Sequence, residues 1–292
     1  MSLDRREALK VLATAGAAAA ASPSAAAAAR PRRTAPDDAV GMLYDATRCI
    51  GCKACMVACK EANGLGYDDP GARWDAPVDL SGSTKTVIKY FDDGENSSYM
   101  KAQCLHCIDP ACVSACMLGS LQKREFGIVT WDPDRCVGCR YCQVACPYGV
   151  PRFEWDKALP KIVKCEMCSH LVVEGGEPAC VEVCPRDAII FGDYRELLAD
   201  AKQRIAANPE KYADRVFGET DGGGTQVLYL AGAGVGYDDL GLPVLGAAGV
   251  PALPEGVQHF VYRGFAAPVA LYAAFAAVTW RNRRAAELED EG

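Results

Sequence analysis

The chain has 292 residues, of which 16 are cysteines, and its 38 acidic side chains outnumber its 31 basic ones. A chain of this length allows one or two domains. The net charge of −7 argues against a nucleic-acid partner, for which a basic surface is expected.

The amino terminus resembles an export signal of the twin-arginine (Tat) type. Arg5 and Arg6 precede a mild apolar run from Val11 to Ala21, and small residues follow it. An ordinary Sec signal or an amphipathic helix is the alternative. We predict a signal peptide over residues 1–29 and a linker, rich in proline and charge, over residues 30–39.

The first cysteine motif follows a strand predicted at Met42–Tyr44. Gly51 lies inside this motif, and we expect it to let the backbone fold tightly around a metal cluster. We expect the same of Gly138, which lies in the third of the four cysteine motifs described below. A short helix is predicted from Ala54 to Asn63, ended by the glycine that follows. The motif has the spacing C-x2-C-x2-C-x3-C and comprises Cys49, Cys52, Cys55 and Cys59.

Residues 64–100 are rich in Gly, Asp and Ser and are interpreted as an insertion that contacts a partner, with one strand at Thr86–Phe91.

The second motif follows. His106 lies in its loop and could ligate iron, but four thiolates are already available, so we expect it to donate a hydrogen bond near sulfur. A hairpin is predicted from Ser120–Lys123 and Gly127–Trp131. The cysteines of this motif are Cys104, Cys107, Cys112 and Cys116.

The third motif is the most specific signal in the chain. It reads C-x2-C-x2-C-x3-C-P, the run with which bacterial ferredoxins hold [4Fe–4S] clusters. Three of its cysteines would wrap one cube, and the fourth, one helical turn further on, would point to a different cube. The pattern therefore predicts a partner motif elsewhere. Its cysteines are Cys136, Cys139, Cys142 and Cys146.

The fourth motif has a loop inserted between its second and third cysteines. A strand is predicted after it at Ile189–Phe191. Asp193 with Glu196 forms a capping-box pattern that predicts a helix from Tyr194 to Ala207. The cysteines of this motif are Cys165, Cys168, Cys180 and Cys184.

The four motifs use every cysteine in the chain and predict four [4Fe–4S] clusters. A disulfide scaffold and zinc sites are the alternatives. A zinc ribbon uses two C-x2-C pairs with a long gap, whereas these motifs place a fourth cysteine after a triplet. The residues alone leave open which motif pairs with which.

The glycine-rich stretch from Phe217 to Gly256 contains no cysteine. Its glycines after an apolar run suggest a dinucleotide-binding loop. We reject that interpretation because the third glycine is misplaced and Tyr237–Pro243 cannot begin the helix that the loop requires. Residues 215–256 are instead predicted to form an extended arm packed on a partner.

Near the carboxyl end, Gly264 to Trp280 is a run of 17 residues without charge. At about 1.5 Å per residue it just spans a hydrocarbon core of roughly 30 Å. The arginines after it predict a cytoplasmic carboxyl end and an extracytoplasmic cysteine domain. A buried globular helix is the alternative. We predict an anchor and tail over residues 257–292, in which His259 could ligate a haem or touch a quinone, although a lone interfacial histidine usually does neither.

The cysteine pattern from Gly41 to Asp193 resembles the four-cluster electron-transfer subunits of periplasmic hydrogenases, formate dehydrogenases and molybdopterin oxidoreductases. Within that superfamily the chain is most similar to iron–sulfur subunits of the hydrogenase 2 type. That likeness includes Gly41–Asp45, Gly222–Val227, the twin-arginine signal and a single carboxy-terminal span. The beta subunits of formate dehydrogenase N are also similar.

The resemblance implies an α+β fold of duplicated bacterial-ferredoxin-like modules, with short hairpins and helices around four clusters and a carboxy-terminal transmembrane helix. It also implies that the first motif pairs with the fourth and the second with the third. The four ligand groups would then be Cys49, Cys52, Cys55 and Cys184; Cys59, Cys165, Cys168 and Cys180; Cys104, Cys107, Cys112 and Cys146; and Cys116, Cys136, Cys139 and Cys142.

By the same resemblance, the chain would relay electrons between the small subunit of a membrane-bound periplasmic [NiFe] hydrogenase and a quinone-reactive membrane subunit. A subunit of a formate dehydrogenase or another molybdopterin oxidoreductase is the alternative. The sequence has no nucleophile–base pair or substrate-pocket pattern, so we expect no catalytic residue. An autonomous oxidoreductase is the competing class, and a reducible but substrate-inert purified chain would count against it. Lys53 and Arg140 are expected to raise the potential of a neighbouring cluster.

Export through the Tat route fits these clusters. Iron–sulfur clusters are assembled in the cytoplasm, and only a route for folded proteins exports them intact.

Overall fold

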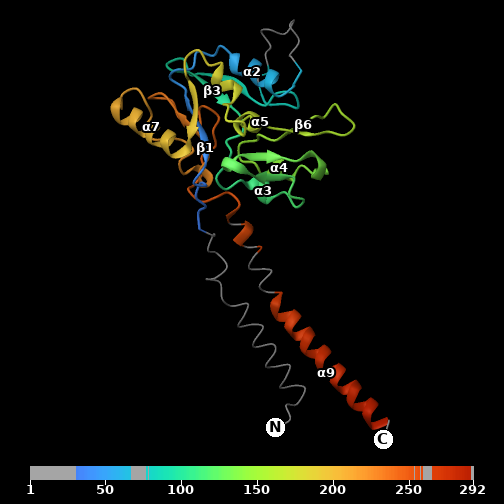
Figure 1. Ribbon diagram of the computed structural model, residues 1–292. Helices are drawn as coiled ribbons and strands as arrows, with labels where there is room; N and C mark the ends of the chain where they lie inside the picture. Colours follow the sequence, from blue (N-terminus) through green and yellow to red (C-terminus); the bar gives the residue numbers. More distant parts are fainter. Residues whose placement is uncertain are drawn as a thin grey trace. The chain divides into compact units, whose positions relative to one another are not determined.

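The computed structural model describes residues 31–66, 77, 79–252, 254–256, 258 and 265–290. The chain divides into two compact units, one made of residues 32–251 and one that includes the carboxy-terminal helix. Figure 1 gives the element labels used below. His259 and the predicted signal peptide lie outside the described residues.

A three-stranded sheet holds together the first and last parts of the larger unit. Its central strand β1 (Val40–Asp45) pairs antiparallel with β8 (Ile189–Asp193) and parallel with β9 (Val227–Leu230). The strand predicted at Met42–Tyr44 is confirmed as the middle of β1, and its three side chains are buried. The sheet thus joins the segment before the first cysteine motif to the segment after the fourth.

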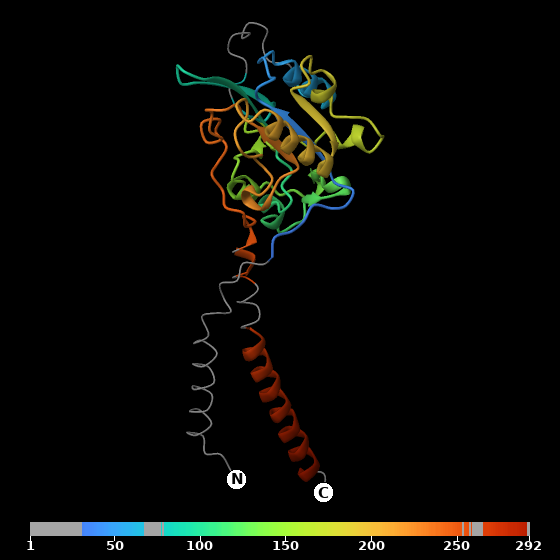
Figure 2. The ribbon, with the colours of Figure 1, turned by 90° about the vertical axis from the view of Figure 1, so that its left-hand side faces the viewer.

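Three hairpins complete the strands of this unit. Strands β2 (Val87–Asp92) and β3 (Ser97–Ala102) form a long ribbon, drawn in teal in Figure 2. Strands β4 (Leu121–Lys123) and β5 (Val129–Trp131) confirm the hairpin predicted between the second and third motifs. The shortest pair is β6 (Arg152–Phe153) with β7 (Ile162–Val163).

Short helices carry the cysteine motifs. The predicted helix of the first motif is confirmed as α2 (Ala54–Ala62), and α3 (Ala111–Ser114), α4 (Tyr141–Ala145) and α6 (Ala179–Glu182) occupy the corresponding places in the other three. The remaining short elements are α5 (Ser169–Val172) and the 3₁₀ turns η2 (Glu125–Gly127), η3 (Pro133–Arg135) and η4 (Asp221–Gly223).

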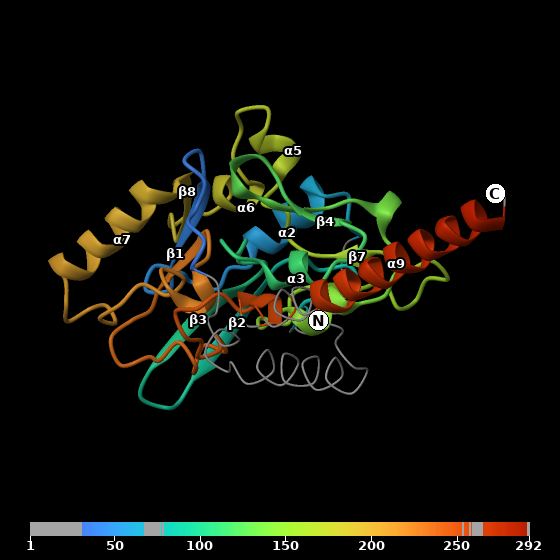
Figure 3. The same cartoon turned by 90° about the horizontal axis from the view of Figure 1, so that it is seen from below.

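Helix α7 (Tyr194–Ala207) covers the face of the sheet opposite the cysteine motifs, as Figures 1 and 3 show. The Asp193 side chain accepts hydrogen bonds from the backbone N–H groups of Arg195 and Glu196, 2.8 and 3.1 Å away, so it caps the helix as the sequence predicted. Leu197 of α7 packs with Leu228 of β9 in one buried cluster. The helix therefore shields one side of the sheet while the cysteine motifs use the other.

Part of the stretch predicted as an extended arm lies inside the larger unit. Its strand β9 is fully buried, and alternate side chains serve the two faces of the sheet. Val227 and Tyr229 join the cluster that contains Cys180, whereas Leu228 and Leu230 face α7. The glycine-rich turn before β9 is the feature that returns the chain to this sheet, which short-range sequence patterns do not reveal.

The carboxy-terminal unit contains helix α9 (Ala266–Asp290). The sequence predicted a membrane span over Gly264–Trp280, but no helix in the described part of the chain is both long enough and apolar enough to cross a membrane. The reason is that α9 begins at Ala266 and runs on through Arg281, Arg283 and Arg284, so its apolar part is short. The structure does not support the predicted transmembrane helix.

Candidate metal centres

The structure gathers the sixteen cysteines into four groups, each drawn from more than one motif. Groups I, II and IV each line a separate cavity. Group III is recognised from Cys107, whose pKa is raised well above its ordinary value by burial and then by the three other thiols. The groups are I (Cys49, Cys52, Cys55, Cys184), II (Cys59, Cys165, Cys168, Cys180), III (Cys104, Cys107, Cys112, Cys146) and IV (Cys116, Cys136, Cys139, Cys142).

These are the groups that the family resemblance implies, and the helices explain how they arise. Helix α2 carries both Cys55 and Cys59, one turn apart, and it packs against α6 of the fourth motif. Helix α3 of the second motif packs against α4 of the third. In α2 the two cysteines at spacing four lie on adjacent turns, so this helix supplies one thiol to its own triplet and one to its partner's. In the other three motifs the helix carries only the first of the two cysteines, and the second follows just after the helix ends.

The cysteine loops have a backbone that turns N–H groups toward sulfur. Lys53 and Arg140 precede their helices in the left-handed conformation, with φ of 60° and 65°. Alternation of right- and left-handed residues makes concave nests of N–H groups that suit anionic ligands, including iron–sulfur sites. The N–H of Met167 lies 3.3 Å from Sγ of Cys165, and that of Ser120 lies 3.2 Å from Sγ of Cys116.

Crowding makes these thiols hard to ionise on their own. Burial, followed by the neighbouring thiols of group II, raises the pKa of Cys59 to about 12. The same two causes raise the pKa of Cys142 in group IV to about 11. Four adjacent thiolates need positive charge among them, so the donor sets fit a cofactor that brings iron.

All sixteen cysteines lie in the described part of the chain, and there each is a free thiol. Among the described residues, no three His, Cys, Asp or Glu side chains stand close enough to share one metal ion. A [4Fe–4S] cube differs from a single ion because it carries each thiolate on a separate iron, which needs a wider arrangement.

His106 is completely buried in the loop of group III. Its Nδ1 accepts a hydrogen bond from the backbone N–H of Val129 at 3.1 Å, which leaves the proton on Nε2. Burial, and then Lys164 and Lys123, hold the pKa of this imidazole well below its ordinary value, so the ring is neutral. No described protein atom pairs with Nε2. An orphaned N–H donor in the loop between Cys104 and Cys107 suits a site filled by sulfide or thiolate acceptors.

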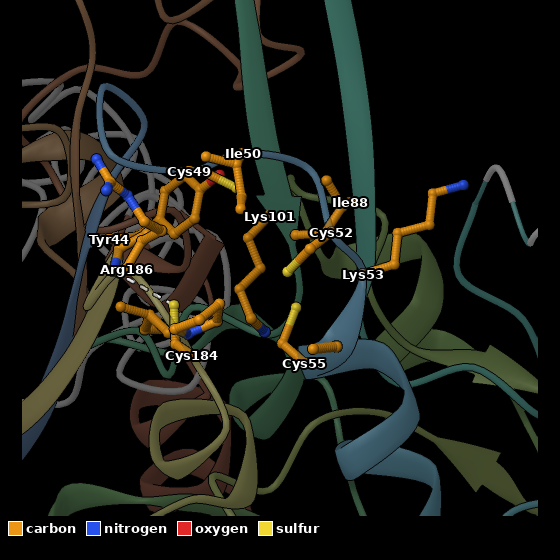
Figure 4. Close-up of a pocket in the computed structure, with 14 residues that line it drawn as sticks. Tyr44, Cys49, Ile50, Cys52, Lys53, Cys55, Ile88, Lys101, Cys184 and Arg186 are labelled. Atoms are coloured by element: carbon orange, nitrogen blue, oxygen red, sulfur yellow. Dashed lines mark hydrogen bonds between the residues drawn. The ribbon is translucent and has the colours of Figure 1, made fainter.

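The two charged residues that the sequence suggested border the groups, Lys53 at the cavity of group I and Arg140 at that of group IV. Arg140 is exposed and stacks on Trp155, with its guanidinium carbon 4.0 Å from the ring centroid. Lys53 points away from the cavity of group I in Figure 4. Three further cations lie near the thiols, the buried Lys101 and Lys164 and the half-buried Lys123, which sequence spacing did not single out.

Comparisons with known proteins agree with this geometry. Residues 96–194 match the family model described as a 4Fe-4S dicluster domain, and residues 40–61 match a 4Fe-4S binding domain. The chain is 39% identical over 282 residues to "Hydrogenase-2 operon protein HybA" of Escherichia coli, an alignment that covers 84% of this chain and 85% of that protein.

Formate dehydrogenase subunits are also similar. The chain is 39% identical over 202 residues to "Formate dehydrogenase, nitrate-inducible, iron-sulfur subunit" of Escherichia coli, with 65% of this chain and 67% of that protein covered. It is 34% identical over 238 residues to "Formate dehydrogenase iron-sulfur subunit" of Haemophilus influenzae, with 77% and 72% covered.

Proposed function

The chain belongs to the ferredoxin-type [4Fe–4S] family that includes HybA and the formate dehydrogenase iron–sulfur subunits, and on that basis we propose that it is the electron-transfer subunit of a membrane-bound [NiFe] hydrogenase. In this role it relays electrons between the hydrogenase small subunit and a quinone-reactive membrane subunit. Groups I to IV hold one cluster each, through the sixteen cysteines named above.

The observation that carries the proposal is the order of the groups in space. Cys55 of group I packs against the buried side-chain cluster that contains Cys180 of group II. Cys165 of group II and Cys104 of group III share a second such cluster, and Cys112 of group III and Cys142 of group IV share a third. Neighbouring groups therefore meet in the order I, II, III, IV, as a relay requires.

The two ends of the row differ from its middle. Cys52 in group I and Cys139 in group IV are exposed, whereas all four cysteines of group II are buried. A bound [4Fe–4S] cluster accepts and releases single electrons. In this proposal the cysteine thiolates hold the clusters, backbone N–H groups point at sulfur, and the surrounding protein keeps water from the central groups. These features set the reduction potentials of the clusters.

Anaerobic purification of the full chain tests cluster occupancy. We expect iron and acid-labile sulfide in equal amounts, at four clusters per chain, with low-temperature EPR signals that appear on reduction. Zinc in place of iron, or thiols oxidised to disulfides, would contradict the proposal.

The catalytic partner is tested by co-purification from the native host. We expect a [NiFe] large subunit to copurify and hydrogen to reduce the clusters. Copurification of a molybdopterin subunit and reduction by formate would favour the alternative, a formate dehydrogenase subunit, which the relatives also support.

For localisation we propose the periplasmic face of the inner membrane, after export by the Tat route. The support is the Arg5-Arg6 pair before an apolar run, together with the uncharged segment from Gly264 to Trp280. Replacement of both arginines by lysine should leave the protein in the cytoplasm. Deletion of residues 257–292 should release the exported protein from membrane fractions, and an unchanged membrane fraction would reject the anchor.

A further inference from the structure

Lys101 is a charged side chain that is almost completely buried beside the cysteine groups. It lies on β3 and is 1% exposed. Its ammonium donates one hydrogen bond to Oγ1 of Thr86 at 2.6 Å and another to Oε1 of Gln103. An ammonium carries three protons, so one remains beyond these two neutral acceptors.

This side chain lines two metal centres at once. It borders the cavity of group I and the separate cavity of group II. Figure 4 shows Lys101 reaching from its strand into the space between Cys55 and Cys184. None of the ion pairs found among the described residues involves Lys101. The negative charge that this ammonium would face is therefore that of the cysteine ligands when clusters are bound.

The energetics of burial show what keeps the charge in place. An isolated ammonium in a protein interior is costly and normally loses its proton. Here the hydroxyl of Thr86 and the amide oxygen of Gln103 accept hydrogen bonds from the ammonium, which lies between two sets of cysteine ligands. Thiolates that hold clusters on both sides would supply the negative charge that a buried ammonium needs.

We propose that Lys101 is a single buried cation common to groups I and II, which keeps the reduction potentials of both clusters high together. The inference rests on the proposed cluster occupancy. Reduction adds one negative charge to a cluster, and a fixed positive charge in a poorly screened interior stabilises that charge. A cation between two sites therefore acts on both, whereas a surface lysine is screened by water and acts weakly on its nearest site.

The decisive variant is Lys101→Met in the full chain, purified anaerobically with its clusters. Potentiometric titration followed by EPR should resolve four one-electron steps in the parent protein. We expect two of the four steps to move to lower potential. Each should lose at least tenfold in the equilibrium constant for reduction, which is about 59 mV for a one-electron couple. The other two steps should move much less.

Lys53→Met is the matched control because it removes the same charge from the border of one group only, at a side chain that points away from the cavity. Lys53 borders the cavity of group I and not that of group II. We expect it to move at most one step, and that step should be one of the two that respond to Lys101→Met.

Gln103→Glu is the second variant, in case loss of Lys101 prevents folding. It is nearly isosteric, keeps an acceptor for the ammonium and adds a negative charge beside it, so the same two potentials should fall. A change in one step only, in none, or equally in all four would overturn the inference. Absence of clusters from the parent protein would instead reject the proposed function.

Discussion

Gly51 shows how one residue sets the geometry of group I. Its φ is +68°, and a Cβ at this position would lie 2.3 Å from Cε1 of Tyr99 on β3. We predict that Gly51→Ala displaces the loop or the β3 strand, so that the protein loses one cluster's worth of iron, because the new methyl group meets a ring that the fold cannot easily move. Iron and sulfide analysis of the purified variant measures this.

Gly64→Ala separates the steric clash from the conformational cost. Gly64 also has positive φ, at +60°, but a Cβ added to it would have no neighbouring atom within 4 Å. This control should cost only the left-handed strain of roughly 1–2 kcal/mol and retain full iron. Equal iron loss in both variants would mean that strain alone, and not the contact with Tyr99, is responsible.

Individual residues of the site differ in how well the sequence predicts them. Cysteine spacing identified every thiol, because a cube restricts the spacing of its ligands along the chain. Sequence spacing did not identify every cation near the thiols. It singled out Lys53 and Arg140, because they lie within motifs, as residues that raise the potential of a cluster. Lys101 directly follows residues 64–100, the stretch interpreted as an insertion, and a fully buried lysine is rare enough that no local pattern predicts it.

At the scale of elements, β9 is the strand on which the sheet and the cysteine helices both depend. Leu228 is 0% exposed and packs with residues of α7. We predict that Leu228→Ala lowers the free energy of unfolding by about 2–5 kcal/mol, because it leaves a cavity between the sheet and the helix. Chemical denaturation of the cluster-loaded protein measures the loss.

Leu159→Ala is the control for that prediction. Leu159 is 87% exposed, so its truncation should change stability far less than the truncation of Leu228. Similar losses in the two variants would contradict the importance of the buried strand β9 for stability.

Elements with a local signal were the ones predicted well. Helix α7 was predicted with its observed bounds because Asp193 supplies a cap and an amphipathic pattern follows. The strand β3 was missed, since Ser97–Ala102 lacks a clear alternation and owes its place to pairing with β2. The partner of β1 in β9 was also missed, because a parallel pairing between segments so far apart in the chain leaves no short-range pattern.

At the scale of the whole molecule, the clusters are expected to be part of the folding core. Cysteines belong to three of the four buried clusters of the larger unit. We predict that removal of iron by chelation under reducing conditions abolishes the cooperative thermal transition, because cavities and crowded thiols then replace bonded ligands. Near-UV circular dichroism and calorimetry measure it. Recovery of the transition when iron and sulfide are returned is the control, and an unchanged transition without iron would contradict the prediction.

The pairing of motifs gives the sharpest test of the molecule as a whole. Cys184 of the fourth motif lines the same cavity as Cys49 of the first, whereas Cys165 of its own motif lines a different one. The double variant Cys49→Ser/Cys184→Ser should therefore lose one cluster, because both ligands come from group I. Cys165→Ser/Cys184→Ser should lose two, although its substitutions lie in one motif. Iron, sulfide and integrated EPR signals distinguish the two results. If each motif instead held its own cluster, the double variant within the fourth motif would lose one cluster and the double variant across motifs would lose two.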